Sequence, residues 1–439
     1  MTGPGAHPRH TQEFNGRGRF RVAAADLAKT AAPPPKAAES LAAPQAAAGV
    51  AQKAAAVAQK VAGLRADLAL AHELAHQAQV REALTRTELT LALTEALKGR
   101  AEAQASARRL AVQRWLERAS PRPVRRRGKL RRGFDRLLLR AGRTGWARLI
   151  ADAGVWRDDD LAEIGLYVRR RADPTAAPAT LFDQAWHLET YSEAAASGLP
   201  PLVHYLVRGA ALGYSPHPLM HTDYYTAHNA SALAATQVSP LEHFVREGAA
   251  LGRNPHPLFD VLHYAAQGPE LAKDEDPASH YVRIGWRDGL SPHPLFDAAW
   301  YRRQMPRQAA ETPPLVHYLT TGWRAGLTPH PLFDPRWYVE QSPDVAEIGT
   351  EPLTHFLIGG AAEGRSPSPW FDLPHYVAAR GEALDSAANP LVDYLQGGAW
   401  AVAEARPGFP TAAYLAATPE LVGQGMTPLE HWARKAAKS

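Results

Sequence analysis

Histidine, aspartate and paired aromatic residues recur together in this chain. The stretch SPHPLFDAAWY at residues 291–301 returns almost intact as TPHPLFDPRWY at residues 328–338. An imidazole beside a carboxylate can transfer protons or bind a metal ion, and an exposed tryptophan can stack on a sugar ring. The recurring residues therefore predict either a row of reactive sites or a structural turn that is repeated along the chain.

A second histidine, followed by an aromatic residue, recurs at a nearly constant spacing. Steps of 39, 37, 37, 38, 38 and 38 residues separate the equivalent positions His204, His243, His280, His317, His355, Asp393 and His431. Such a period is typical of stacked repeat proteins, in which equivalent residues of neighbouring repeats lie about one layer, ~10 Å, apart. One zinc ion cannot bridge that distance, because each Zn–N bond measures about 2.0–2.1 Å. We therefore expect neutral histidines that are hydrogen-bonded to turn backbone and no metal site, and a pairing between histidines of the two motifs is the alternative left open.

Other catalytic arrangements find little support in the sequence. The chain has no cysteine, which excludes thiolate nucleophiles, disulfides and thiolate metal sites. It also lacks a phosphate-binding glycine loop and a G-x-S-x-G motif. Acidic clusters stand at residues 157–161, RDDDL, and 273–277, KDEDP, and a capped helix start explains the first of them better than metal binding. We predict that the protein is not an enzyme and uses no cofactor.

Each repeat predicts a first helix of defined start and end. In PLVHYLTTGWRAGLTPHPLFDPRWY, residues 314–338, Pro314 suits the first helical position, and Tyr318 and Gly322 fall on one helix face. Glycine costs about 1 kcal/mol relative to alanine inside a helix, so its recurrence at the position of Gly322 predicts close packing between helix backbones. Gly326 then predicts a left-handed helix end.

The PHPLFD motif predicts the start of a second helix. Asp297 can accept a hydrogen bond from a backbone amide of the first turn, and Phe296 can pack on Tyr301 as a hydrophobic staple. Two helices joined by a proline turn thus make one repeat. About seven such repeats over residues 181–439 predict an all-α fold, an α-solenoid.

One aromatic position in each repeat has no settled structural role. Tyrosine occupies the position of Tyr301 in six of seven repeats, whereas the position before it varies between Trp, Tyr, His and Ala. Consecutive residues lie about 100° apart on a helix, so we expect the tyrosine in the core and its neighbour at the rim. Stacking on a ligand and packing between repeats both remain open for the neighbour. The candidate ligand contacts are Trp186, Tyr224, Trp300 and Trp337, together with the turn histidines His293 and His330.

The first 118 residues have a different composition. Residues 1–47 are rich in Ala and Pro, which predicts a disordered arm. Residues 48–118 lack proline and predict a long helix. Its apolar residues follow a seven-residue pattern through Val50, Val57 and Leu64, which is typical of a coiled coil. The pattern breaks up near Leu84, so self-association as a homo-oligomer through residues 50–97 competes with a helical hairpin or a docking helix.

Residues 119–148 form a concentrated basic segment. Between residues 108 and 148, fifteen Lys and Arg accompany two acidic residues, a local net charge of +13 in a chain of net charge +5. Apolar residues at helical spacing predict a basic amphipathic helix here, and residues 149–180 predict connecting helices. The segment can dock on the repeats, lie on an anionic membrane or bind another polyanion, of which nucleic acid is the least supported because no recognition motif accompanies the charge. The candidate contacts are Arg125, Arg126, Arg127, Lys129, Arg131, Arg132, Arg136 and Arg140.

The amino-terminal residues carry no secretory signal pattern, because they lack its apolar core. No run of the sequence reaches the roughly 18 apolar residues of a spanning helix. We therefore expect a cytoplasmic protein, peripheral at the inner face of the membrane if the basic segment binds lipid.

The repeat resembles a known family. The unit PLVHYLTTGWRAGLTPHPLFDPRWYVEQSPDV at residues 314–345 is similar to the tandem units that accompany glycosyltransferases and other sugar-modifying domains in bacterial surface-polysaccharide proteins. The resemblance covers residues 181–439 and implies a helical scaffold without an activity of its own, because this sequence contains no recognisable glycosyltransferase or sulfotransferase domain. Met220 and His221 replace the usual Phe and Asp, and Asp393 replaces the histidine.

Two functions remain as hypotheses. The first is a non-catalytic scaffold that binds a protein partner, such as a glycosyltransferase or an export component. The alternative is a carbohydrate-binding module that recognises a surface polysaccharide through the repeat aromatics.

Overall fold

The computed structural model describes residues 43–119, 121–122, 136–156, 161–170, 173, 176–272, 275–401 and 404–437. Two compact parts make up the chain, residues 1–80 and 81–439. Regular structure in the described ranges is helical throughout, and the β-type pairing there consists of isolated bridges inside turns. The predicted all-α fold class is therefore confirmed. The predicted N-terminal arm lies outside the described residues, except that the long helix already begins at Ala43.

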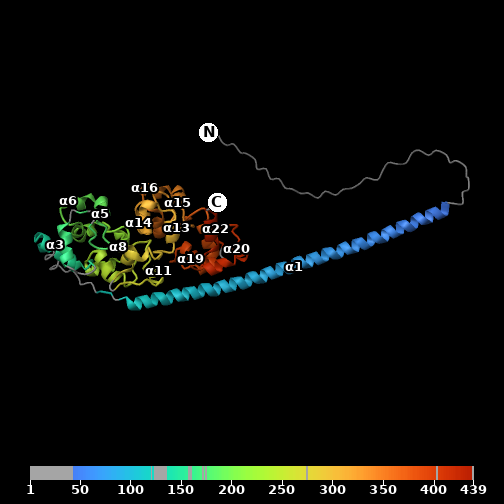
Figure 1. Ribbon diagram of the computed structural model, residues 1–439, viewed down its shortest axis with the longest axis horizontal. Helices are drawn as coiled ribbons and strands as arrows, with labels where there is room; N and C mark the ends of the chain where they lie inside the picture. The colour runs from blue at the N-terminus through green and yellow to red at the C-terminus, as the bar shows by residue number, and fades with distance from the viewer. Residues whose placement is uncertain are drawn as a thin grey trace, which may run out of the picture. The chain divides into compact units, whose positions relative to one another are not determined.

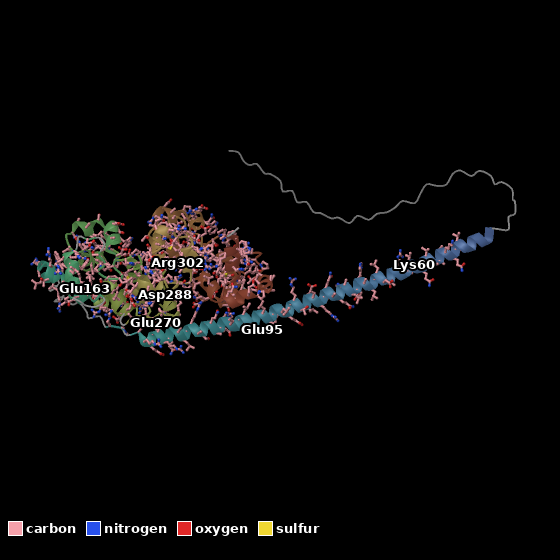
Figure 2. The ribbon with its side chains drawn as sticks, viewed as in Figure 1. Lys60, Glu95, Glu163, Glu270, Asp288 and Arg302 are labelled. Atoms are coloured by element: carbon pink, nitrogen blue, oxygen red, sulfur yellow. The ribbon has the colours of Figure 1, made fainter. Side chains whose placement is uncertain are left out.

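Helix α1, Ala43–Arg118, is a single helix of 76 residues that crosses the boundary between the two parts. Within the first part, the apolar residues of the seven-residue pattern are exposed: Val50 by 69%, Val57 by 62% and Leu64 by 60% of their surface. Side chains stand out on both sides of this ribbon, where Lys60 is labelled (Figure 2). The predicted long helix is confirmed, and the apolar stripe is exposed to solvent among the described residues of this part.

Within the second part, residues 81–118 of α1 dock on the repeats. Leu97 is 2% exposed and packs with Trp400 and Leu415 in a small apolar cluster, flanked by Leu93. Near the end of the helix, Trp115 packs against the main core. A docking helix was one of the alternatives that the sequence left open, and Leu93 and Leu97 make this contact, whereas Leu84 and Leu89 are exposed.

Helices α3, Arg143–Ala153, and α4, Leu161–Arg169, lie between α1 and the repeats in the chain, and α3 packs against a helix of the first repeat. Helix α3 ends at Gly154 with a left-handed φ of 62°, and α4 packs against α3. Leu149, Ile150 and Ile164 are buried between them and join the main core. The connecting helices predicted for residues 149–180 are therefore present.

The predicted pair of helices recurs through the rest of the second part. The first helix of each pair starts with proline, as predicted: α7 Pro201–Val207, α10 Pro240–His243, α12 Pro277–His280, α14 Pro314–His317, α17 Pro352–His355, α19 Pro390–Gln396 and α22 Pro428–Ala436. The second helices are α5 Gln184–Thr190, α8 Thr222–His228, α11 Val261–Ala265, α13 Ala298–Arg302, α15 Pro335–Gln341, α18 Leu373–Arg380 and α20 Thr411–Ala417. Short helices follow four of these: α6 Ser192–Ala196, α9 Ala230–Thr236, α16 Pro343–Ile348 and α21 Glu420–Gln424. Within this part, the chain advances from α3 at one end to α20 and α22 at the other (Figure 1).

The first helices end in a wider turn than expected. Four of them continue as one π-helical turn, Phe244–Gly248, Tyr281–Gly285, Tyr318–Gly322 and Phe356–Gly360. A bond of 2.9 Å from the Ala249 amide to the Phe244 carbonyl closes the first of these turns. The expectation of a regular α-helix up to the glycine was therefore wrong. The predicted left-handed ends are confirmed, because Gly213, Gly252, Gly289, Gly326 and Gly364 all have φ between 71° and 78°.

Aromatic rings fill the core along the repeats. Phe296 and Tyr301 pack at a centroid distance of 5.2 Å, which confirms the hydrophobic staple. Tyr301 in turn meets Tyr318 of the next first helix edge-on at 5.6 Å. Both tyrosines are fully buried. The recurring tyrosine is therefore core, and it joins consecutive helix pairs.

Candidate functional site

The aspartate of each PHPLFD motif has a structural role. Asp297 Oδ1 accepts a hydrogen bond of 2.8 Å from the Trp300 amide, as predicted for a helix cap. The Asp297 amide donates to the carbonyl of Pro329 in the following turn at 2.9 Å. Where His221 replaces the aspartate, its Nδ1 accepts from the Tyr224 amide at 3.2 Å. The motif thus caps a helix and links one turn to the next.

The histidine of each PHP turn binds its own backbone. Nδ1 accepts from the amide two residues on at 3.0–3.1 Å in His217, His256, His293 and His330. Burial holds the pKa of these imidazoles below the usual 6.5, that of His293 at about 3. The prediction of neutral histidines that are bonded to turn backbone is confirmed for this group.

The histidine of the first helix has a different partner from the one predicted. Its Nδ1 meets the hydroxyl of the tyrosine in the preceding second helix, at 2.6–2.9 Å, in the pairs Tyr225–His243, Tyr264–His280, Tyr301–His317, Tyr338–His355 and Tyr414–His431. The prediction of a backbone partner was wrong here, because the tyrosine reaches across from the neighbouring helix. These bonds join consecutive helix pairs.

The recurring glycine makes room for this bond. A Cβ at Gly248, Gly285, Gly322, Gly360 or Gly398 would overlap the hydroxyl of the tyrosine concerned. The sequence correctly predicted close packing at this position, but a tyrosine hydroxyl approaches the glycine, and not a second backbone as expected.

Two repeats depart from the tyrosine–histidine pair. Asp393 replaces the histidine, accepts from the Tyr376 hydroxyl at 2.5 Å and forms an ion pair of 2.9 Å with Arg380. At the other end, His187 replaces the tyrosine and bonds to the Ser215 carbonyl at 2.9 Å. The fully buried imidazole of His204 then has no hydrogen-bond partner at either nitrogen. The first repeat therefore lacks the tyrosine–histidine bond and leaves its buried histidine ring unpaired.

The aromatic ligand candidates are half-buried, and three of the four have partners inside the chain. Trp300 donates from its indole nitrogen to Thr328 at 2.8 Å, and guanidinium groups of Arg303 and Arg434 lie 5.4 Å from its ring centre. Trp186 meets Tyr191 edge-on at 6.2 Å, and Tyr224 lies 4.2 Å from the His228 ring. Trp337 is half-buried, and among the described residues its ring has no aromatic or cationic neighbour. A role in ligand contact stays a prediction for all four.

The basic candidates fall mostly on residues that are not described. Arg125, Arg126, Arg127, Lys129, Arg131 and Arg132 lie outside the described ranges, and Arg136 and Arg140 are exposed. Residues 157–160 of the first acidic cluster also lie outside them. In the second cluster, Asp276 caps α12 through a bond of 2.9 Å from the Ser279 amide, and Glu275 pairs with Arg283 at 2.7 Å. The described acidic residues of this cluster, Glu275 and Asp276, thus have structural roles, which were not predicted from the sequence.

Several cavities open in the second part, and two of them measure about 890 and about 210 Å³. The larger, of about 890 Å³, lies between the end of α1 and the segment from α10 to α12. Its lining includes Arg114, Trp115 and Arg118 from α1, and Val245 and Glu270 from the repeats. Glu270 is labelled in Figure 2. The smaller, of about 210 Å³, contains the turn histidines His293 and His330 among its lining residues. No group of three or more histidine and carboxylate side chains in the described ranges has the arrangement of a metal site.

Sequence reasoning missed the residues that complete the smaller cavity. Arg108 of α1 and Glu430 of α22 line it, and Arg434, one turn after Glu430, forms ion pairs with Glu430 and Asp297. Asp297 and Arg434 are 137 residues apart, and no periodic signal connects them.

Of the helices that the structure describes, none combines the length and apolar character that crossing a bilayer requires. Comparisons with known protein families, with characterised proteins and with solved structures found no match.

Proposed function

We propose that the protein is a non-catalytic scaffold whose helix pairs stack as an α-solenoid of about seven repeats. The observation that carries this proposal is the use of the recurring polar residues: the aspartates cap helices, and the histidines bond to turn amides or tyrosine hydroxyls. These hydrogen bonds hold the repeats together, so the recurring aspartates and histidines have a structural role that explains why they recur. The resemblance of the repeat to units of surface-polysaccharide proteins supports a partner from that machinery.

We propose further that residues 50–78 of α1 associate with a second copy of the chain as a coiled coil. The supporting observation is the exposure of Val50, Val57, Leu64 and Leu68, which recur at coiled-coil spacing and are each at least 59% exposed. A contiguous apolar stripe of this kind costs free energy when it faces water, and pairing with a like stripe removes it from water.

The self-association has a matched test within the same helix. Leu64→Glu with Leu68→Glu places charges on the stripe, whereas Leu70→Glu with Leu74→Glu places them on equally exposed leucines outside it. Analytical ultracentrifugation of the full chain should show a dimer or higher oligomer for the wild type and the control, and a monomer for the stripe variant. A wild-type monomer, or equal masses for the two variants, would refute the coiled coil.

The basic segment is proposed to place this scaffold at the cytoplasmic face of a membrane. Flotation of the full chain with vesicles of anionic lipid should succeed at low salt and fail with neutral lipid, because basic segments bind through charge that salt screens. Affinity capture of the full chain from cell extract, followed by identification of retained glycosyltransferases or export proteins, tests the protein partner. Retention of neither kind of protein would count against that partner.

The carbohydrate-binding alternative depends on Trp337. Its ring is half-buried and lacks the cationic neighbours that cover Trp300. Trp337→Ala should abolish binding to a surface polysaccharide while thermal unfolding stays unchanged, and Trp300→Ala serves as the comparison. Unchanged glycan binding in Trp337→Ala would refute this alternative.

A further inference from the structure

The smaller cavity contains hydrogen-bond donors that the fold leaves unused. His293 is 7% exposed and His330 is 4% exposed, and both rings line the cavity. Each Nδ1 accepts from a backbone amide, so the neutral ring carries its proton on Nε2 and donates from there. Neither Nε2 atom has a hydrogen-bond partner among the described residues. Each Nε2 is therefore a donor at the cavity wall that a bound polar group can use.

Other polar groups from distant parts of the chain meet at the same place. Arg108 reaches the cavity from α1, His263 from α11 and Glu430 from α22. Glu430 uses Oε1 for its ion pair with Arg434, at 2.7 Å, and its Oε2 makes no hydrogen bond with the described chain. The cavity therefore offers an acceptor as well as donors.

The charges around the cavity cancel. Arg108 and Arg434 are positive, and Asp297 and Glu430 are negative. Burial lowers the pKa of His263 to about 4 and that of His293 to about 3, and it also lowers the pKa of His330, so all three rings are neutral at pH 7. An anion would meet two carboxylates here and a cation two guanidinium groups. A neutral polar molecule meets no such repulsion.

The size of the cavity limits the ligand further. Its volume of about 210 Å³ is below the range of about 300–1,000 Å³ that is typical of sites for drug-sized ligands. We propose that this cavity binds a neutral molecule that carries several hydroxyl groups, of about the size of one pyranose or inositol ring. Each hydroxyl group can both donate and accept, which matches the imidazole and guanidinium donors opposite the Glu430 carboxylate. This site is independent of the proposed protein partner and of the aromatic row.

The probes for the test are methyl β-glucoside, methyl β-galactoside, N-acetylglucosamine and myo-inositol, with inorganic phosphate as the anionic comparison. Saturation-transfer NMR on the full chain should show saturable binding of at least one of the four neutral probes. Phosphate should not bind more tightly than that probe. Double substitution His293→Ser with His330→Ser removes both imidazole donors and leaves shorter hydroxyl groups in their place. Serine suits this turn because Ser368 occupies the equivalent position in the next repeat and keeps the turn bond from the Phe371 amide, 3.3 Å.

A matched control exists in the same turns. His217→Ser with His256→Ser makes the same change in two turns that do not line the cavity. Binding should weaken about tenfold or more in the first double variant, which corresponds to about 1.4 kcal/mol, and stay unchanged in the control. Arg108→Ala, on an exposed face of α1, should weaken binding likewise and carries the test if the serine variant does not fold. Absence of saturable binding, tighter binding of phosphate, equal losses in variant and control, or full binding in Arg108→Ala would overturn the proposal.

Discussion

Two adjacent glycines in one helix turn give a direct test of the tyrosine–histidine bond. A Cβ on Gly360 would overlap the Tyr338 hydroxyl and would lie 3.2 Å from His355 Nδ1 and 3.3 Å from the Tyr338 ring carbon Cζ. A Cβ on Gly359 would meet only the flexible Glu363 carboxylate, at 3.6 Å. Neither glycine has a positive φ, so alanine is compatible with the backbone at both positions. Gly360→Ala and Gly359→Ala therefore differ in the contact with tyrosine and in little else.

The expected cost of Gly360→Ala follows from the atoms that must move. The Tyr338 hydroxyl has to leave His355 Nδ1, a bond of 2.9 Å, and two polar groups at a mostly buried position lose their partner, at a cost of about 1–3 kcal/mol. Displacing a fully buried ring in a packed core adds about 1–3 kcal/mol. Alanine returns about 1 kcal/mol of helix propensity, so a net loss of about 1–5 kcal/mol is expected, against no loss or a small gain for Gly359→Ala.

A double-mutant cycle separates the overlap from general damage to the core. Tyr338→Phe removes the hydroxyl, so adding Gly360→Ala should cost less in that background, with a coupling of about 1–2 kcal/mol. Urea denaturation of the full chain measures the free energies, and hydrogen exchange around α15 and α17 localises the loss, since stability in repeat proteins depends on neighbouring repeats. Equal stability of Gly360→Ala and Gly359→Ala, or strict additivity in the cycle, would refute the reasoning.

Three further predictions concern the same repeats. His187→Tyr should raise the melting temperature in calorimetry, because a tyrosine hydroxyl at this position can reach the unpartnered His204 ring; a lower melting temperature would contradict this. Arg380→Ala should lower the free energy of unfolding by about 1–3 kcal/mol in urea titration, because the half-buried Asp393 carboxylate loses its ion pair. Arg324→Ala, on the surface, is the control and should change this free energy little. Acid should destabilise the repeats: burial lowers the pKa of His217 and His263 to about 4, so these rings bind protons more readily when unfolded. The contribution of these neutral histidines to the free energy of unfolding is complete above pH 6.5. Between pH 6.5 and 4 it falls by about 1.4 kcal/mol per pH unit for each histidine. A urea midpoint that does not change over that pH range would rule this contribution out.

The sequence predicted the local structure of the repeats well, because its signals lie within a few residues of each other. Proline at the helix start, Asp297 at the cap, Phe296 against Tyr301 and glycine at the left-handed end each follow from short-range geometry. The contacts between repeats were beyond this reasoning. The Tyr301–His317 bond spans 16 residues, and it depends on how two helices cross, which spacing alone does not define. The π-helical turn at Gly322 is likewise a product of that packing.

The smaller cavity also could not be predicted from the sequence, because its residues come from helices far apart in the chain. The repeat pattern places His293 and His330 on consecutive turns. Two other polar residues that line the cavity do not follow from the pattern: Arg108 lies outside the repeats, and Glu430 lies on the last helix. Glu430 and Arg434 lie on α22, and Asp297, the ion-pair partner of Arg434, caps α13, 137 residues earlier in the chain. A chain with the same motif but a different number of repeats would bring another helix to this place. If the cavity binds a ligand, removal of one internal repeat should therefore abolish binding even where the remaining repeats fold, and ligand-observed NMR on such a deletion variant would show whether it does.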